Sequence, residues 1–315
     1  MGRIALPEML RHKYEKHLVA GVIASSGTLA VLIPPSIPMV IYAIFAEESI
    51  GKLFLAGYLP GVLSIILFAV MIIIRVRLNP NLAPPITEVV TWRQRLGSLK
   101  ESWGIGLLIF LVMGSLYSGF FNATEASALG ALGAFILMAV TKTYQWKKIW
   151  DGFSETLLVG GMIFLILVAA ITYSRFIGLT GLPKAVANWI IAKNVSVYAI
   201  ILLFCFMLTF LGCFMDAISM LLLTMPVFLP ILKALDVNLI WFGIIYIKLV
   251  EIGCITPPFG ITIFVLAGVA GDILPIGTIF RGIFWFLLME FFTLAIIIIF
   301  PEISLFLPNI VRGSP

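Results

Sequence analysis

A chain of 315 residues that is 62% hydrophobic and only 11% charged cannot be a soluble globular protein, because soluble domains are about 45–50% apolar and about 25% charged. The mean hydropathy of +1.16 and the spread of apolar residues over the whole length instead predict one integral membrane domain over residues 1–315. The formal net charge is +5. The basic residues behind it gather in short loops between apolar runs, which is typical of cytoplasmic loops and not of a nucleic-acid-binding surface.

Two adjacent prolines interrupt the first apolar run, which starts at Leu18 after a charged leader and breaks at Pro34-Pro35. Proline opposes continuation of the helix before it and removes a backbone N–H. In hydrocarbon each backbone group left without a partner costs several kcal/mol, so such a break lasts only where it lines a polar cavity or binds an ion. Residues 18–33 are short for a straight span, and we expect them to form one arm of a re-entrant helical hairpin.

A polar connector at residues 78–103 follows a span predicted over residues 53–74. Five basic residues, counting Arg75 and Arg77, outnumber the two acidic residues Glu88 and Glu101 in this region, which places the connector in the cytoplasm. Further on, Thr124-Glu125 has the pattern of a helix N-terminus with an acidic first turn. The remaining apolar runs predict spans at residues 105–121, 126–140, 157–173, 196–211 and 279–300, a short amphipathic helix at 184–193 and a proline-kinked helix at 217–235.

A second Pro-Pro pair, Pro257-Pro258, interrupts the run that begins with an arm at residues 240–252. The step from the first proline of each pair to a later glycine is similar in the two halves, 57 − 34 = 23 and 282 − 257 = 25. Interrupted apolar segments at corresponding positions of two halves point to the binding site of a secondary transporter. The alternative is two ordinary proline-kinked helices. We divide the domain into a partial first repeat (1–77), the connector (78–103), intervening helices (104–195) and a second repeat (196–315).

The most informative charge is Asp216, which is set in apolar sequence. An ionisable residue inside a span is costly and functional by default, whereas at a helix end it would simply lie in water. At the two breaks, backbone carbonyls suit Na⁺ and backbone N–H groups suit a carboxylate. The candidate substrate- and ion-binding residues are Ser26, Gly27, Thr28, Pro34, Pro35, Ser36, Asp216, Ser219, Gly253, Thr256, Pro257, Pro258, Gly260 and Thr262. Among them we expect Asp216, Gly27 and Thr256 to be the Na⁺ ligands.

Other charged residues carry weaker signals. Glu251 could pair with Lys248 one turn earlier and be purely structural, and Glu290 in the last span receives no role. An intramembrane aspartyl protease would need a Gly-x-Gly-Asp motif, and residues 270–272 lack its first glycine. A serine version would need a histidine inside the spans, and both histidines lie in the leader. We therefore expect a transporter and not an enzyme, with no cofactor besides Na⁺ as coupling ion.

Several motifs together resemble the large membrane subunit of tripartite ATP-independent periplasmic (TRAP) transporters. They are Gly27-Thr-Leu-x-x-Leu-Ile-Pro-Pro-Ser36, Ser49-Ile-Gly-Lys-Leu-Phe-x-Ala-Gly57, Thr124-Glu-Ala, Gly212-x-x-x-Asp216, Ile252-Gly-x-Ile-Thr-Pro-Pro-x-Gly260 and the ending Phe300-Pro-Glu-Ile-Ser-Leu-Phe-Leu-Pro308. The resemblance implies an all-α, polytopic, elevator-type carrier with two inverted repeats and a helical hairpin in each. It also implies Na⁺ coupling and a location in the bacterial inner membrane. The implied partners are a small four-helix membrane subunit and a periplasmic solute-binding protein that delivers an organic acid, such as a C4-dicarboxylate or sialic acid.

The resemblance starts in the middle of the family's first repeat, at the segment Ile4-Ala-Leu-Pro-Glu-Met9. The helices expected before this segment are missing, and the first repeat has no counterpart of the helix that leads into Gly212–Asp216. Two alternatives to a complete carrier subunit therefore stay open. One is a truncated remnant that does not transport, and the other is a stand-alone ion-coupled carboxylate carrier that works without a binding protein.

Overall fold

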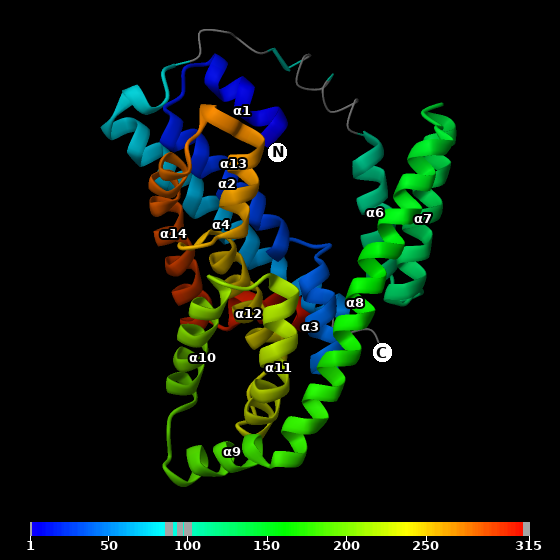
Figure 1. Cartoon of the computed structure of the whole chain (residues 1–315), viewed down its shortest axis with the longest axis vertical. Helices are drawn as coiled ribbons and strands as arrows, with labels where there is room; N and C mark the ends of the chain where they lie inside the picture. The colour runs from blue at the N-terminus through cyan, green and yellow to red at the C-terminus, as the bar shows by residue number, and fades with distance from the viewer. Residues whose placement is uncertain (1, 86–90, 93–96, 98–102, 311–315) are drawn as a thin grey trace. The chain divides into compact units, whose positions relative to one another are not determined.

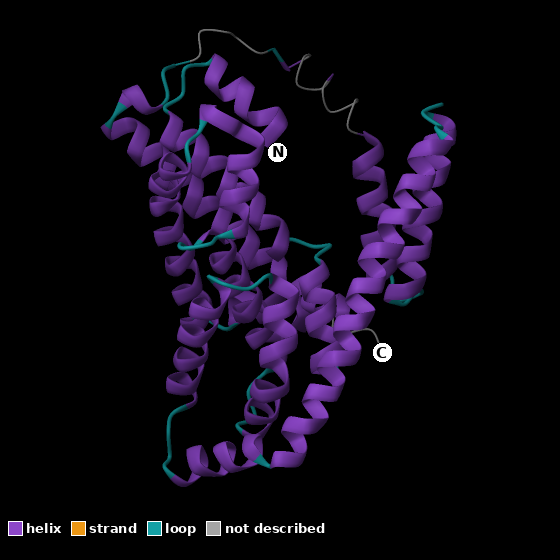
Figure 2. Cartoon of the chain, in the orientation of Figure 1, coloured by secondary structure: helices purple, strands orange, loops and turns teal. Residues whose placement is uncertain are grey.

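The computed structural model describes residues 2–85, 91–92, 97 and 103–310, and every regular element within them is a helix (Figures 1 and 2). Charges that were expected to hold the connector in the cytoplasm, Glu88, Arg93, Arg95, Lys100 and Glu101, lie outside the described residues. The helices are α1 (Gly2–Arg11), α2 (Lys16–Leu32), α3 (Ile37–Ala46), α4 (Ile50–Leu78), η1 (Pro80–Leu82), α6 (Trp103–Tyr117), α7 (Ala123–Val140), α8 (Trp146–Thr180), α9 (Leu182–Ala192), α10 (Val197–Gly212), α11 (Ala217–Ala234), α12 (Leu239–Ile255), α13 (Ile261–Ala270), η2 (Gly271–Ile273), α14 (Ile276–Ile299) and α15 (Glu302–Ile310).

Six described segments are long and apolar enough to cross a membrane. They are Lys16–Ala46, Ile50–Leu78, Ala123–Val140, Trp146–Thr180, Ala217–Ala234 and Ile276–Ile299. The all-α, polytopic membrane fold predicted from the sequence is therefore confirmed.

Contacts divide the chain into two compact units, one built chiefly from Met1–Pro85 and Ala169–Gly313 and the other from Ile86–Val168. In the second unit α6 packs against α7, where a Cβ added to Gly133 would lie 2.7 Å from Leu111. The N-terminus of α7 is closed by a capping box, in which Asn122 and Glu125 exchange two hydrogen bonds of 2.9 Å. The helix start predicted at this turn is confirmed, and capping accounts for Glu125.

The first unit is organised along α14, which lies against α2 and α4. A Cβ added to Gly21 of α2 would meet the carbonyl oxygen of Gly282 and would lie 2.6 Å from the Phe286 ring. On another side, Phe68 of α4 meets Phe286 edge to face, with the ring centroids 5.2 Å apart. Only glycine lets α2 and α14 approach so closely, and the Gly57 and Gly282 positions noticed in the sequence are both close-approach points of this kind.

Helix α12 runs along α14 in the opposite direction to α2. Its first turn reaches the end of α14, because the Trp241 indole Nε1 donates to the Ile297 carbonyl at 2.9 Å, whereas Lys248 further along α12 reaches Glu290. In contrast, α2 begins beside Gly282. The two half-helices that precede the breaks therefore enter the unit from opposite ends, as inverted repeats require.

Each half-helix that follows a break continues in the direction of the one before it (Figure 1). The Tyr42 hydroxyl of α3 donates to the Leu239 carbonyl at 2.8 Å, so α3 runs on to the far end of α12. Likewise, Ile263 and Leu266 of α13 lie in one apolar cluster with Val19 of α2. This differs from the re-entrant hairpins expected from the sequence. Because each second half-helix continues in the same direction, α3 is buried against α12 and α13 against α2. A second half-helix that folded back would not make these apolar contacts.

Replacing Gly282 with alanine should destabilise the fold, because the new Cβ would collide with the backbone carbonyl of His17. We expect a loss of about 1–3 kcal/mol, the usual effect of overpacking, measured as thermal unfolding of the purified protein in detergent. Gly277→Ala is the matched control on the same helix, since nothing described lies within 4 Å of its Cβ. Equal stability of the two variants would contradict the close contact of α2 with α14.

Candidate functional site

Helices α2 and α12 both contact α4 in the middle of the unit. The carbonyl oxygen of Leu32, the last residue of α2, lies 2.7 Å from the position of a Cβ on Gly57. Near the end of α12, the Lys248 ammonium donates to the Ser64 hydroxyl at 2.9 Å. Both half-helices therefore run beside α4. The end of α12 overlaps α2, because Ile255, its last residue, belongs to one apolar cluster with Val19, Ala20 and Ile23 of the first half of α2. Secondary transporters place such half-helix ends inside the bundle around a transported solute.

The first break covers residues 33–36, between α2 and α3, and the Pro34-Pro35 peptide bond within it is cis. Pro34 is buried and Pro35 is exposed. The Ser36 hydroxyl donates to the carbonyl of Val31 in the last turn of α2. This bond satisfies a carbonyl that the end of the helix would otherwise leave without a partner.

The second break has the same local chemistry. The Thr256 hydroxyl donates to the Ile252 carbonyl at 2.6 Å, and the Thr256 N–H donates to the Gly253 carbonyl at 3.2 Å. Pro257-Pro258 is again cis, and both prolines are exposed. A hydroxyl therefore closes the last turn of each half-helix, which explains structurally why Ser36 and Thr256 stand where they do.

Helices α3 and α13 begin at the breaks without a side-chain cap among the described residues, as α9 and α14 also do. Their N-cap positions are Ser36, whose hydroxyl is used by Val31, and Gly260, whose φ of +34° lies in the region that favours glycine. Thr262, half-buried, lies in the first turn of α13. Uncapped first-turn N–H groups carry partial positive charge and suit an anion such as a carboxylate.

Asp216 is the N-cap of α11 and is exposed. Its Oδ2 accepts from the backbone N–H groups of Ile218 at 3.0 Å and Ser219 at 3.2 Å. The alternative weighed from the sequence, a carboxylate at a helix end, therefore describes its position. A role as cation ligand remains a prediction, and the half-buried Ser219 contributes its backbone to the cap.

The turn that carries Asp216 packs against the second break. A Cβ on Gly253 would lie 2.8 Å from the Cα of Gly212, so the backbones of α10 and α12 touch there. Beyond this contact, the rings of Phe214 and Phe259 approach to 5.5 Å between centroids. The structure thus brings together the Gly212–Asp216 turn and the residues around Pro257-Pro258, which are far apart in the sequence.

The remaining candidates, Ser26, Gly27 and Thr28, lie inside α2 and not in the break. The Thr28 hydroxyl donates to the Ser25 carbonyl at 2.9 Å and the Ser26 hydroxyl to the Ile23 carbonyl at 3.3 Å. Nothing described lies within 4 Å of a Cβ placed on Gly27. Ser25 is fully buried, and its hydroxyl has no hydrogen-bond partner within the described chain. No described hydrogen bond links these residues to Asp216.

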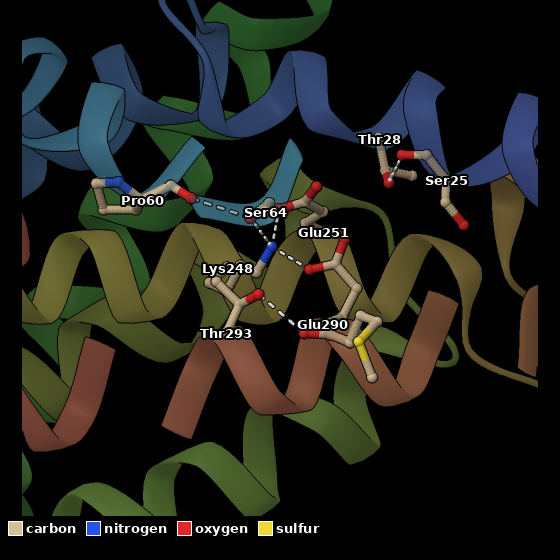
Figure 3. Close-up of polar contacts among 9 residues, drawn as sticks. Ser25, Thr28, Pro60, Ser64, Lys248, Glu251, Glu290 and Thr293 are labelled. Carbon is tan, nitrogen blue, oxygen red and sulfur yellow. Dashed lines mark hydrogen bonds and ion pairs between the residues drawn. The ribbon is translucent and has the colours of Figure 1, made fainter. Parts of the chain in front are cut away.

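A buried charge cluster lies beside the breaks (Figure 3). The Lys248 ammonium contacts Glu251 Oε2 at 2.9 Å, forms an ion pair with Glu290 Oε2, and donates to Ser64. All four side chains are fully buried. The pair of Lys248 with Glu251 was one of the alternatives considered from the sequence. The partner of Glu290 was missed, because it lies on another helix, 42 residues away by number (290 − 248).

A repeat signal that the sequence analysis missed involves two more prolines. Pro7 lies inside α1 and Pro230 inside α11. Each precedes the first proline of the next break by the same distance, 34 − 7 = 27 and 257 − 230 = 27. This equal spacing agrees with two repeats in which α1 would correspond to the C-terminal part of α11, and the division into repeats stays a prediction.

Comparison with known families identifies the chain. The model of the family described as "Tripartite ATP-independent periplasmic transporter, DctM component" matches residues 1–303. The chain belongs to this family. TRAP large permeases are membrane transport components, so the expected multi-pass transporter class is confirmed at this level.

Individual relatives support the same assignment. The C4-dicarboxylate TRAP transporter large permease protein DctM of Pseudomonas aeruginosa is 34% identical over 98% of this chain and 71% of its own length. The sialic acid TRAP transporter permease protein SiaT of Haemophilus influenzae is 32% identical over 98% of this chain, which spans 50% of SiaT. The ectoine/5-hydroxyectoine TRAP transporter large permease protein UehC of Ruegeria pomeroyi is 30% identical over 98% of this chain and 72% of UehC.

The capping role of Asp216 can be separated from its charge in this TRAP permease. Asp216→Asn should leave the stability nearly unchanged, because asparagine is as good an N-cap as aspartate, whereas Asp216→Ala should cost about 0.5–2 kcal/mol. Thermal unfolding of the two variants beside the wild type measures the difference. Equal losses in both variants would show that the carboxylate charge, and not the cap, stabilises this helix end.

Proposed function

We propose that the chain is the large permease subunit of a Na⁺-coupled TRAP transporter of the bacterial inner membrane. In this proposal it works with a small four-helix membrane subunit and a periplasmic solute-binding protein, and it imports the organic acid that the binding protein delivers. The observation that carries the proposal is the pair of helices that are interrupted at Pro-Pro breaks, enter from opposite ends and overlap inside one unit, with the end of α12 beside the first half of α2. A helix that was merely kinked would leave no helix ends inside the bundle.

The half-helix ends supply chemistry for both a cation and an anion. The last carbonyls of α2 and α12 carry partial negative charge, and their caps Ser36 and Thr256 keep hydroxyl lone pairs that can face a cation. The uncapped N-termini of α3 and α13 carry the opposite charge and suit a carboxylate. In this proposal Na⁺ is held by Asp216 with the backbone near Gly27 and with Thr256. An elevator-type movement would carry both ligands across.

A carboxylate is the substrate class that these features favour. The names of two relatives given above include C4-dicarboxylate and sialic acid, and the name of the third includes ectoine. The uncapped helix N-termini at the breaks favour an anionic group on the solute. We therefore propose an organic acid such as a C4-dicarboxylate, sialic acid or a similar carboxylate.

Reconstitution of the chain with its small subunit and binding protein in liposomes tests the proposal. Uptake of radiolabelled succinate, sialic acid and ectoine is measured with an inward Na⁺ gradient and with the gradient abolished. We expect uptake of at least one acid, dependent on both the gradient and the binding protein. Uptake without the binding protein would favour the stand-alone carrier, and no uptake of any of the three would favour the non-transporting remnant.

Asp216→Asn should lower Na⁺-dependent uptake at least tenfold, because it removes the carboxylate and keeps the helix cap. Asp236→Asn is the matched control. It makes the same charge change just beyond the other end of α11, at an exposed position with φ of 53° that asparagine tolerates. Uptake is measured in the same liposomes, with equal protein content checked by immunoblot. Unchanged Na⁺ dependence in Asp216→Asn would remove Asp216 from the ion site.

A further inference from the structure

The charge cluster on α12 and α14 carries one more negative than positive group. Lys248 supplies one cation, and Glu251 and Glu290 supply two carboxylates, all with no exposed surface. No other charged residue is described in contact with the three. Cys254, one turn further along α12, is a titratable neighbour of Glu251. An uncompensated charge in a membrane interior is strongly unfavourable, so the cluster must hold one more positive charge.

The hydrogen bonds of the cluster show where that charge can be placed. The Lys248 ammonium donates to Ser64 and Glu251 and forms an ion pair with Glu290, so each of its three protons faces a partner. In contrast, Glu251 Oε1 and both carboxyl oxygens of Glu290 have no hydrogen-bond partner in the described chain. Both carboxyl groups contact the same Lys248 ammonium, so they lie close enough to repel each other when both are ionised. Two such carboxylates in a dry site hold one proton between them.

A metal ion is the weaker candidate, because the Lys248 ammonium already occupies the position between the two carboxylates (Figure 3). Placing Na⁺ beside this ammonium would bring two cations together in a medium of low dielectric constant. A proton added to a carboxyl oxygen removes the excess charge without a second cation. We propose that Glu251 and Glu290 form a buried proton-binding site that holds one proton beside Lys248.

The position of the site ties it to the second break. Its α12 residues lie in the last two turns before Thr256, and its other residues come from α4 and α14. The equivalent positions of the first repeat are uncharged. The offset between the first prolines, 257 − 34 = 223, relates Lys248 to Ser25 and Glu251 to Thr28. The proton site is therefore found on α12 only. The proton neutralises the extra carboxylate beside α12, whereas the equivalent positions of α2 carry no charge to neutralise.

Infrared spectroscopy of the purified protein in lipid nanodiscs at neutral pH tests the inference without any transport assay. A protonated carboxylic acid gives a carbonyl-stretch band, separate from that of carboxylates, that shifts in D₂O. We expect this band in the wild type. Because the proton is shared, either Glu290→Gln or Glu251→Gln alone should abolish it, since the remaining carboxylate then pairs with Lys248. Glu302→Gln, at an exposed carboxylate at the start of α15, is the control that should keep the band.

Thermal unfolding of the same variants gives an independent readout. Each single variant leaves a neutral cluster and should unfold within a few degrees of the wild type, whereas Glu251→Gln combined with Glu290→Gln leaves Lys248 unpaired and should unfold many degrees lower. The inference is overturned if the wild type lacks the band, if the band survives both single variants, or if the single variants unfold as early as the double variant. A defect in transport would change none of these readouts.

Discussion

Helix ends inside an apolar interior need partners for their backbone groups, and this constraint shapes the whole first unit. Helices α2 and α12 both end within the bundle, where water is not freely available to their last carbonyls. Ser36 and Thr256 each give a hydroxyl hydrogen to one of these carbonyls. The same positions were chosen from the sequence as ligand candidates. Each hydroxyl hydrogen is used in a structural hydrogen bond, so only the oxygen lone pairs are available to a ligand.

Glycine contacts allow the neighbouring helices to cover the breaks. Gly57 meets the end of α2, Gly253 meets Gly212 at the end of α10, and Gly282 meets the start of α2. A side chain at any of these points would separate two helices. Without such close contacts, the half-helix ends would face lipid instead of protein, where orphaned backbone groups are most costly. The glycines beside the breaks therefore allow the broken helices to keep their unpaired backbone groups covered by protein.

The sequence predicted the elements better than their partners. Both breaks, the spans and the start of α7 follow from local signals, because proline chemistry, apolar length and capping act over a few residues. The direction of α3 and α13 did not follow, since it depends on the distant helices against which they bury their apolar faces. Glu290 received no role for the same reason: its partner Lys248 lies on another helix. For Asp216, the sequence showed an unusual charge but could not distinguish a helix cap from an ion ligand.

The two broken helices, α2 with α3 and α12 with α13, share a backbone plan but differ in their polar chemistry. At equivalent positions before the breaks, α2 carries the hydroxyls of Ser25 and Thr28, whereas α12 carries Lys248 and Glu251. Neutral hydroxyls can be buried without a counter-charge, and Ser25 even remains without a hydrogen-bond partner in the described chain. Charged groups cannot: Lys248 and Glu251 balance each other, but Glu290 from α14 adds a second carboxylate, which the proposed proton neutralises. The two broken helices therefore follow the same backbone plan in opposite directions, while these few side chains make them chemically unequal.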